Sequence, residues 1–276
     1  FNGNSQNGYM LKNVRFNLTE QTQQEYRVGL FSKINAGATV KNLKMSIREL
    51  NVSIINGNSS NVFVGGLAST NAGTLSSVQV DILNSVVTAN SNNVYVGGIV
   101  GLNENLISNA FVDGNLVVSR TGGEETCIGG LAGKNESVIT GTLTLNRNIN
   151  NASVFNGSKY NSSLNMTIKY ASLYDYKNCG FGGIAGVSSG TISKVSSNAT
   201  ISFGENLQTS PLTMPSNVGG IVGKLVGSDT QKAQLTQVLS TAKVYGNENV
   251  GGVVGNAQNA FIQYVYYLML ENFDAL

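Results

Sequence analysis

The sequence predicts an all-β, single-domain parallel β-solenoid of about seven coils, with one repeat of about 32 residues in each coil. Three observations predict it: a glycine pair that returns along the chain, a hydrophobic position at a fixed distance after each pair, and period-2 alternation beyond that position. No segment of useful length shows the 3.6-residue stripe of an amphipathic helix.

The glycine pair marks one corner of each expected coil. It interrupts a good strand in stretches such as VGGIVG, and a weaker copy, VGLFSK, contains Gly29. Because glycines inside a strand indicate a bend or a close backbone approach, we expect a Cβ to be in the way here. The first glycines of the pairs are Gly65, Gly97, Gly129, Gly182, Gly219 and Gly251, which lie 32, 32, 53, 37 and 32 residues apart. The longer steps indicate the same unit with insertions.

A hydrophobic position ten residues after the first glycine starts the next strand of each coil. It is occupied by Leu75, Ile107, Ile139, Ile192 and Phe261, by Leu235 after an insertion, and by Val40, eleven residues after Gly29, in the weaker copy. Three residues further stand Leu43, Val78, Ala110, Thr142, Val195, Val238 and Tyr264. Alternation such as Val78, Val80 and Ile82 then predicts a strand with one buried face.

A unit this short buries too little to fold alone, so neighbouring coils must stack at about 4.8 Å. A propeller is the main alternative, but its blades of about 40–45 residues contain four strands, and this repeat is short for that. We expect one domain over residues 1–276, with insertions near 146–178 and 203–217 and an apolar C-terminal tail over 264–276. The chain opens on FNGNSQNGYM without an initiator Met, which favours a portion excised from a longer protein.

Residues 96–119, VGGIVGLNENLISNAFVDGNLVVS, resemble the GLUG repeat of bacterial and protist surface proteins. Residues 1–18, FNGNSQNGYMLKNVRFNL, and 29–45, GLFSKINAGATVKNLKM, look like the lead-in coils that precede such repeats. The resemblance covers nearly the whole chain. It implies the solenoid architecture and a place among adhesins, large secreted proteases and other surface proteins. The repeat itself has no catalytic residue, so none is carried over.

Composition removes several function classes. The chain has no His, which excludes a Ser/His/Asp or Cys/His arrangement and a typical zinc site. Its net charge of +2 and 12% charged residues argue against nucleic-acid binding, and no apolar run approaches the roughly 18 residues of a membrane span. We therefore expect no enzyme activity, no catalytic residue, no metal and no cofactor.

A β-helical carbohydrate-active enzyme is the alternative that shares this architecture, and it would need clustered acids. Asp81 and Asp113 lie 32 residues apart and should stack on neighbouring coils. Two stacked carboxylates could share a cation or serve as glycosidase acids. Two solvated residues on a strand face are the simpler interpretation.

The two cysteines occupy nearly the same corner of consecutive coils. Cys127 lies two residues before Gly129, and Cys179 lies three residues before Gly182. We expect a disulfide between them, which would indicate an oxidising compartment. Two buried thiols are the alternative.

Sequons and aromatic residues suggest sites on the surface. Candidate N-glycosylation sites, which have meaning only in a eukaryotic source, are Asn17, Asn51, Asn58, Asn135, Asn151, Asn156, Asn161, Asn165 and Asn198. Four of them crowd residues 151–167, which we expect to form an exposed loop. Candidate ligand-facing aromatics around the same insertion are Tyr160, Tyr170, Tyr174 and Tyr176.

The C-terminal stretch AFIQYVYYLMLENFDAL adds an apolar run where a free solenoid end should turn polar. The candidate self-association residues are Tyr266, Tyr267, Leu268, Met269 and Leu270. The alternatives are a tail that folds back as a cap and the loss of a neighbouring domain. We expect an extracellular structural or interaction module of a cell surface or filament, with protein partners and with glycans as possible ligands. A carbohydrate- or partner-binding adhesin comes second, and a carbohydrate-active enzyme third.

Overall fold

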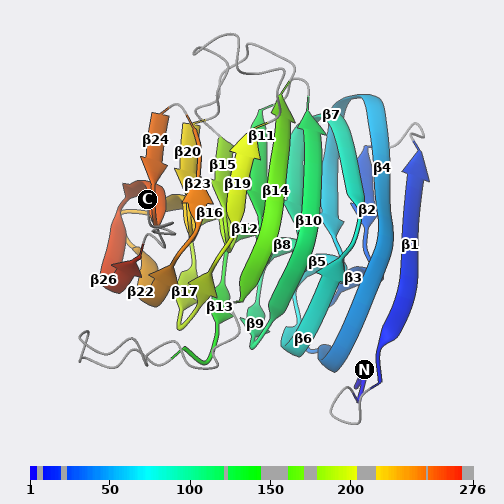
Figure 1. Cartoon of the computed structure of the whole chain (residues 1–276), viewed down its shortest axis with the longest axis horizontal. Helices are drawn as coiled ribbons and strands as arrows, with labels where there is room; N and C mark the ends of the chain where they lie inside the picture. The colour runs from blue at the N-terminus through cyan, green and yellow to red at the C-terminus, as the bar shows by residue number, and fades with distance from the viewer. Residues whose placement is uncertain are drawn as a thin grey trace, which may run out of the picture.

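The protein is a rod of parallel β-strands wound into coils. The computed structural model describes residues 1–4, 9–19, 24–120, 124–143, 161–170, 179–203, 216–246 and 248–268. Within these ranges the chain forms strands and turns but no helix, and its strands pair in parallel. The strands lie side by side from β1 at one end to β24 and β26 at the other (Figure 1). The predicted all-β parallel solenoid is therefore confirmed. No described segment is a helix long and apolar enough to cross a membrane.

Each coil has three faces, which we name by their place relative to the glycine pair. The pre-glycine face holds β2 (Glu25–Val28), the ends of β4 (Thr39–Gly65) and β7 (Ser85–Gly97), β11 (Glu125–Gly129), β15 (Cys179–Gly182), β20 (Ser216–Gly219) and β24 (Glu248–Gly251). The post-glycine face holds β3 (Phe31–Ile34), β5 (Ala68–Asn71), β8 (Val100–Asn103), β12 (Ala132–Asn135), β16 (Ala185–Ser188), β21 (Val222–Val226) and β25 (Val254–Gln258). These seven strands form one sheet, so the described chain makes seven coils.

The long face closes each coil and includes the first parts of β4 and β7. Its other strands are β1 (Leu11–Thr19), β6 (Thr74–Ile82), β9 (Leu106–Ser108), β10 (Phe111–Arg120), β13 (Val138–Thr140), β14 (Ser162–Tyr170), β17 (Thr191–Ser193), β18 (Ser196–Ser197), β19 (Thr200–Phe203), β22 (Ala233–Ser240), β23 (Lys243–Val244) and β26 (Ala260–Tyr267). Pre-glycine and long-face strands together form a 19-stranded sheet.

The glycine pairs stack in register. Gly97 pairs with Gly65 on one side and with Gly129 on the other, and Gly129 pairs with Gly182 although 53 residues separate them. The row then continues through Gly182, Gly219 and Gly251. The longer steps are therefore insertions between equivalent coils, as the spacing predicts.

Lack of space requires glycine at this corner. A Cβ on Gly97 would lie 2.0 Å from the carbonyl oxygen of Val100 on the same coil and 2.7 Å from that of Leu131 on the next coil. A Cβ on Gly98 would lie 2.5 Å from the carbonyl oxygen of Gly130. The first glycine therefore permits the turn within a coil, and the second permits the close approach of its neighbour.

The long face buries the first hydrophobic row that the sequence predicts, with one correction in the last coil. In the second row, Thr142 is exposed and lies outside any strand, so its assignment was wrong as well. The fully buried row runs through Leu75, Ile107, Ile139, Ile192 and Leu235. In the last coil it continues with Ile262, and the second row continues with Val265. The assignments of Phe261 and Tyr264 to these rows were wrong by one residue. The turn before β26 is one residue longer than in most coils, so Ile262 stands eleven residues after Gly251.

Part of the insertion predicted over 146–178 is a regular strand. β14 pairs with β10 on one side and with β19 on the other, so it belongs to the long face of its coil. Residues 144–160, 171–178 and 204–215 lie outside the described residues. The tail predicted over 264–276 begins inside β26, which pairs with β22 as part of the last coil.

A buried row of polar side chains closes the turn after the post-glycine face. Asn71 donates a hydrogen bond of 2.8 Å to Asn103, and Asn103 donates one of 2.7 Å to Asn135, with Nδ2 as donor and Oδ1 as acceptor in both. Asn135 donates in turn to the hydroxyl of Ser188 at 3.0 Å. All four side chains are buried. The row satisfies polar groups inside the rod and holds consecutive coils in one register.

Candidate functional site

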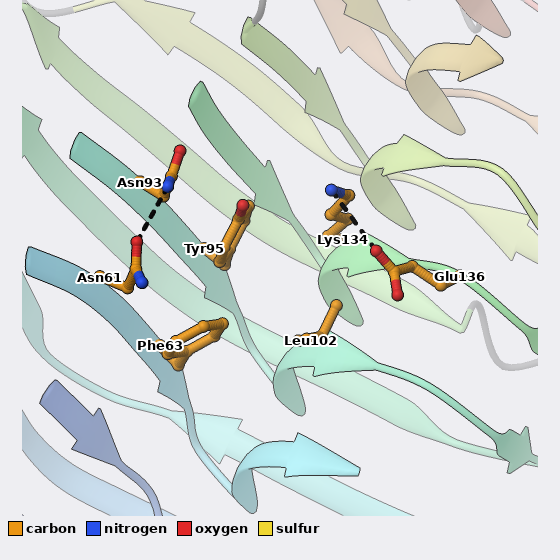
Figure 2. A pocket seen from close by; sticks show the side chains of 7 residues that line it. All are labelled: Asn61, Phe63, Asn93, Tyr95, Leu102, Lys134 and Glu136. Carbon is orange, nitrogen blue, oxygen red and sulfur yellow. Dashed lines mark hydrogen bonds and ion pairs between the residues drawn. The ribbon is translucent and has the colours of Figure 1, made fainter. Parts of the chain in front are cut away.

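A small pocket lies at the corner where the pre-glycine and post-glycine faces meet. It has a volume of about 150 Å³, and Figure 2 shows the side chains around it. They are Asn61 and Phe63 from β4, Asn93 and Tyr95 from β7, Leu102 from β8, Lys134 from β12, and Glu136 from the turn after β12. The glycine turn bends the chain so that outward side chains of both faces converge here. We call this site the corner pocket.

Aromatic rings and cations stack along one wall of the corner pocket. The ring centroids of Phe63 and Tyr95 are 5.2 Å apart. The Arg27 guanidinium lies 5.0 Å from the Phe63 centroid, and the Lys134 ammonium lies 5.5 Å from the Tyr95 centroid. Phe63 is 7% exposed and Tyr95 is 8% exposed. The chain's own groups therefore cover the rings, which leaves little ring surface for stacking a sugar.

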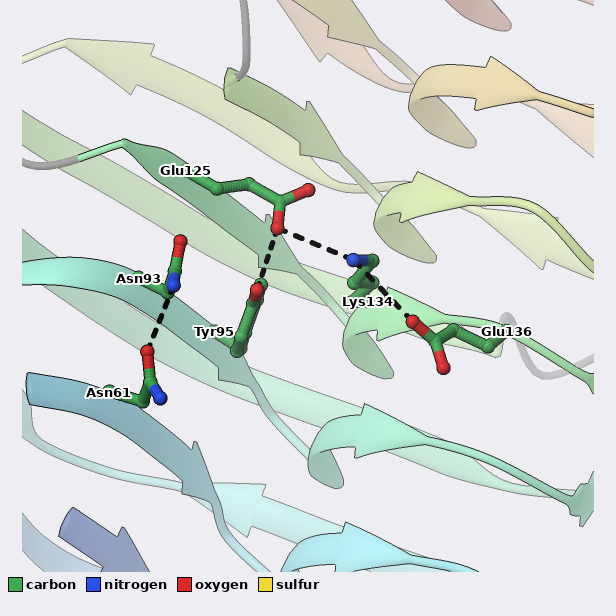
Figure 3. A network of polar contacts seen from close by, with 6 residues as sticks. All are labelled: Asn61, Asn93, Tyr95, Glu125, Lys134 and Glu136. Carbon is green, nitrogen blue, oxygen red and sulfur yellow. Dashed lines mark hydrogen bonds and ion pairs between the residues drawn. The ribbon is translucent and has the colours of Figure 1, made fainter. Parts of the chain in front are cut away.

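A polar network spans the same corner (Figure 3). The Tyr95 hydroxyl donates to Oε2 of Glu125 at 2.6 Å, and the Lys134 ammonium lies 3.3 Å from that same oxygen. Lys134 also lies 3.4 Å from Oε1 of Glu136. Beside this network, Nδ2 of Asn93 donates to Oδ1 of Asn61 at 2.9 Å. One ammonium thus bridges carboxylates from both faces and ties the faces together.

The protonation states follow from burial and from Glu125. Burial and then the hydrogen bond to Glu125 raise the pKa of Tyr95 well above its usual range. Burial is the largest single effect and opposes the charge on Lys134, but Glu125, Cys127 and Glu136 together outweigh it, so the pKa of Lys134 is raised. Burial, followed by the charge of Glu125, raises the pKa of the Cys127 thiol well above its usual value. At neutral pH the phenol and thiol are therefore protonated, so neither is an activated nucleophile.

These features favour a structural role for the corner pocket. Its volume is below the roughly 300–1,000 Å³ of ordinary ligand sites. The part of the chain that the structure describes contains no group of three or more His, Cys, Asp or Glu side chains that could hold a metal ion. The pocket braces the glycine turn on its outer side by joining two faces that also share the hydrophobic core on the inner side.

The predicted disulfide between Cys127 and Cys179 is not formed, and that prediction was wrong. Cys127 pairs with Gly180, while Cys179 pairs with Thr126, so the cysteines are offset by one residue. Side chains of a strand alternate between its two faces, so this offset points the sulfurs in opposite directions. Cys127 packs outside with Phe63 and Tyr95, and Cys179 packs in the main core. Both are buried, which is the alternative that the sequence left open.

The structure divides the candidate glycosylation sites into accessible and buried ones. Asn17, Asn51, Asn165 and Asn198 are exposed. Asn135 and Asn161 are buried, and their amides donate inside the rod to Ser188 and to the carbonyl oxygen of Ala110. These two side chains cannot carry a glycan in this fold. Asn58 lies in β4, and Asn151 and Asn156 lie outside the described residues.

Asp81 and Asp113 stack on neighbouring coils, as the spacing predicts. Asp81 accepts a hydrogen bond of 2.9 Å from the Gln79 amide, and Asp113 accepts one of 2.9 Å from the Gly114 backbone. These contacts account for one oxygen of each carboxylate. They fit the interpretation of two solvated residues on a strand face.

The candidate ligand-facing aromatics remain a prediction. Tyr160, Tyr174 and Tyr176 lie outside the described residues, and Tyr170 ends β14. Of the candidate self-association residues, Tyr266 and Tyr267 end β26 and Leu268 follows, whereas Met269 and Leu270 lie outside the described part.

The last coil exposes more large apolar side chains than any other described coil. The exposed residues there are Val250, Phe261, Ile262, Tyr264, Tyr267 and Leu268. Tyr264 also has a φ of 53°, in the left-handed region, which is unfavourable for a bulky side chain. The Tyr267 ring lies over Gly252, where ring carbons come within 2.6 Å of the place of a Cβ. An aromatic residue thus covers one part of an otherwise open end.

No protein-family model, curated protein or solved structure matches this chain. The resemblance to GLUG repeats therefore stays a prediction based on the quoted residues. The corner pocket and the coil ends are known here from their geometry alone.

Sequence reasoning missed the corner pocket, although a signal for it was present. Phe63, Tyr95 and Cys127 each stand two residues before the first glycine of a pair, in VFVGG, VYVGG and TCIGG. Extending the repeat register upstream of the glycines would have placed all three in one row. Lys134 also recurs in register, because Lys33 and Lys224 lie in the same row of the post-glycine face.

Proposed function

We propose that this chain is a structural and interaction module of a cell surface or extracellular filament, which associates with further copies through its coil ends. The observation that carries the proposal is the open apolar end formed by β24, β25 and β26. Its inward-facing Val250 is 42% exposed because no described residue covers it, while the equivalent Val218 is fully buried. An uncovered edge of parallel strands is a template for adding further strands.

Other features support this proposal. The corner pocket is small and braced by its own residues, and the stacked Asp81 and Asp113 are bound locally. The resemblance to repeats of surface proteins supports the extracellular setting. A solenoid of equivalent coils suits a rigid spacer because each coil contacts only its neighbours.

The test compares two substitutions of an exposed valine. Val250→Asp places a carboxylate on the open end, and Val86→Asp places one on the side of the rod, where Val86 is 51% exposed. Sedimentation velocity over a range of concentrations should show that the intact chain and Val86→Asp assemble, while Val250→Asp stays monomeric. Thermal melts of both variants control for folding.

Two results would count against the proposal. Equal assembly of Val250→Asp and the intact chain would show that the end is not the contact. A monomeric intact chain at high concentration would remove the self-association altogether.

A further inference from the structure

We infer that copies join head to tail in a single register, in which β24 and β25 of one copy pair with β2 and β3 of the next. In the same step, β26 replaces residues Phe1–Asn4 beside the next copy's β4. This inference rests on the proposed self-association and names the surfaces that make it.

Incomplete burial of the core is concentrated at the two ends of the rod. Apolar residues that pack on the main core but stay partly exposed are Val14, Phe16, Leu18, Leu30 and Phe31 at one end, and Val244, Val253, Val254, Ala260 and Val265 at the other, with Phe203 the exception. Each end therefore presents half-covered core positions that a further coil would bury.

The strand register shows which residues would meet. Val28 begins an inward row that passes through Val64 and ends, several coils later, at Val218 and Val250. One further step of this row would set Val250 of one copy against Val28 of the next.

The post-glycine face gives the same result. Its rows begin at Phe31 and Ile34 and end at Val254 and Ala257. Continuing both rows by one coil brings apolar residues onto apolar residues. The two faces therefore agree on one register, with no slip between them.

On the long face, two segments compete for one place. Phe1–Asn4 lies beside Lys41, held by backbone hydrogen bonds of 2.9 Å from Gly3 to Lys41 and 3.0 Å from Lys41 to Phe1. In the shared register, Ile262 of an incoming β26 falls next to Val40, in the space of these residues. The eight-residue β26 offers a longer ladder than this short bridge, so we expect it to displace Phe1–Asn4.

The remaining part of the long face is complementary as well. β26 covers only the first part of that face, and the last strand of the second part is β23. At the other end, β1 lies on the second part, where Phe16 pairs with Leu50. Continuing the rows places β1 of the next copy beside β23, with Phe16 near Val244. No strand position is then left empty, but Tyr267 falls on the Met45 row, where Leu11 of the next copy lies. The start of β1 must therefore move together with Phe1–Asn4.

Charge disfavours contact between two N-terminal ends. The described residues of 1–50 contain seven Lys and Arg and two Glu, a net of +5, whereas those of 243–268 contain Lys243 and Glu248, a net of zero. Two N-terminal ends therefore repel each other, while unlike ends meet without net repulsion. Such a contact is heterologous and does not close, so it would build a filament.

Engineered cysteines test the register. Lys33 is an exposed residue on β3, and Asn256 ends the same row on β25, so the two would stack at about 4.8 Å between copies, within reach of a disulfide. Lys33→Cys chains mixed with Asn256→Cys chains should form an oxidised dimer at least tenfold faster than either variant alone. Lys44→Cys, exposed on the long face of the same end, mixed with Asn256→Cys is the matched control. The native cysteines are buried and should not compete.

A second variant tests the displacement. A Cβ on Gly3 would lie 2.6 Å from the carbonyl oxygen of Asn42, so Gly3→Val should loosen residues 1–4 and tighten self-association severalfold. Unchanged or weaker association would overturn the exchange of β26 for these residues. Assembly without preferential cross-linking of positions 33 and 256 would overturn the register but leave the proposed function standing. Absence of any assembly would overturn both.

Discussion

Replacing Gly97 with alanine tests the explanation of the repeated glycine pair. The new Cβ would lie 2.0 Å from the carbonyl oxygen of Val100, where an ordinary carbon–oxygen contact is about 3.3 Å or more. The backbone would have to open by more than about 1 Å to relieve this contact. It cannot simply move outward, because Leu131 and Gly133 of the next coil present backbone atoms at 2.7 and 2.8 Å.

The expected loss of stability is at the upper end of the range for overpacking. Added methyl groups in well-packed sites cost about 1–3 kcal/mol when side chains can adjust. Here every close neighbour is a backbone atom, and the strain reaches two coils. We therefore expect Gly97→Ala to lower the free energy of unfolding by about 3 kcal/mol or more, a large share of the stability of a typical domain.

Gly37→Ala is the control, because Gly37 has a φ of +79° and nothing within 4 Å of the place of a Cβ. Gly37→Ala should lower the free energy of unfolding only by the cost of placing alanine in the left-handed region, about 1–2 kcal/mol. Urea unfolding followed by circular dichroism would measure both, with unchanged m-values as the condition for comparing them. If Gly97→Ala lost no more stability than Gly37→Ala, the explanation by close backbone approach would fail.

The other predictions concern polar groups of the rod. Asn103→Ala should lower the free energy of unfolding by about 2–3 kcal/mol because it breaks a buried amide row. Asn93→Ala, in a partly exposed row, should lower it by less than about 1 kcal/mol. Urea unfolding of both variants measures the difference. Because the pKa of Tyr95 is raised, the folded chain keeps this proton at a pH where the unfolded chain loses it, so the free energy of unfolding should fall as pH rises above about 10. The fall should be less steep in Tyr95→Phe. If the free energy of unfolding, measured at several alkaline pH values, had the same slope against pH in both chains, this expectation would be wrong. Iodoacetamide should label neither Cys127 nor Cys179 in the folded chain and both after denaturation without reductant, as counted by mass spectrometry.

The coils could be predicted from the sequence because their corner repeats in the sequence itself. Only glycine fits where the backbones approach so closely, so glycine returns in each coil. From the equal spacing of these glycines, the stacking of Gly65, Gly97 and Gly129 could be predicted. The same spacing placed Asp81 beside Asp113. These predictions needed only the count of residues between fixed corners.

The two misplaced side chains have one physical cause, which is that strand faces alternate with every residue. The Cys127–Cys179 prediction tolerated an offset of one residue, but that offset reverses the direction of a side chain. Phe261 was misplaced in the same way, since nothing in the sequence marks the longer turn before β26. The row from Asn71 to Asn135 was missed because asparagine is equally common in exposed turns.

The features of the rod that favour a partner lie in its end coils, where core positions are partly uncovered. Inside the rod, each coil covers the core of the next, and the polar groups at the corner bond to one another. The polar groups that would otherwise suggest a ligand site are bonded to one another, as in the contacts of Glu125 with Tyr95 and Lys134. Among the residues that the structure describes, the end coils have inward-facing side chains that no other coil covers, such as Val250 and Ile262. Because stability in a solenoid comes from contacts between neighbouring coils, an end coil gains from any surface that continues its rows, and a second copy continues them without change of register.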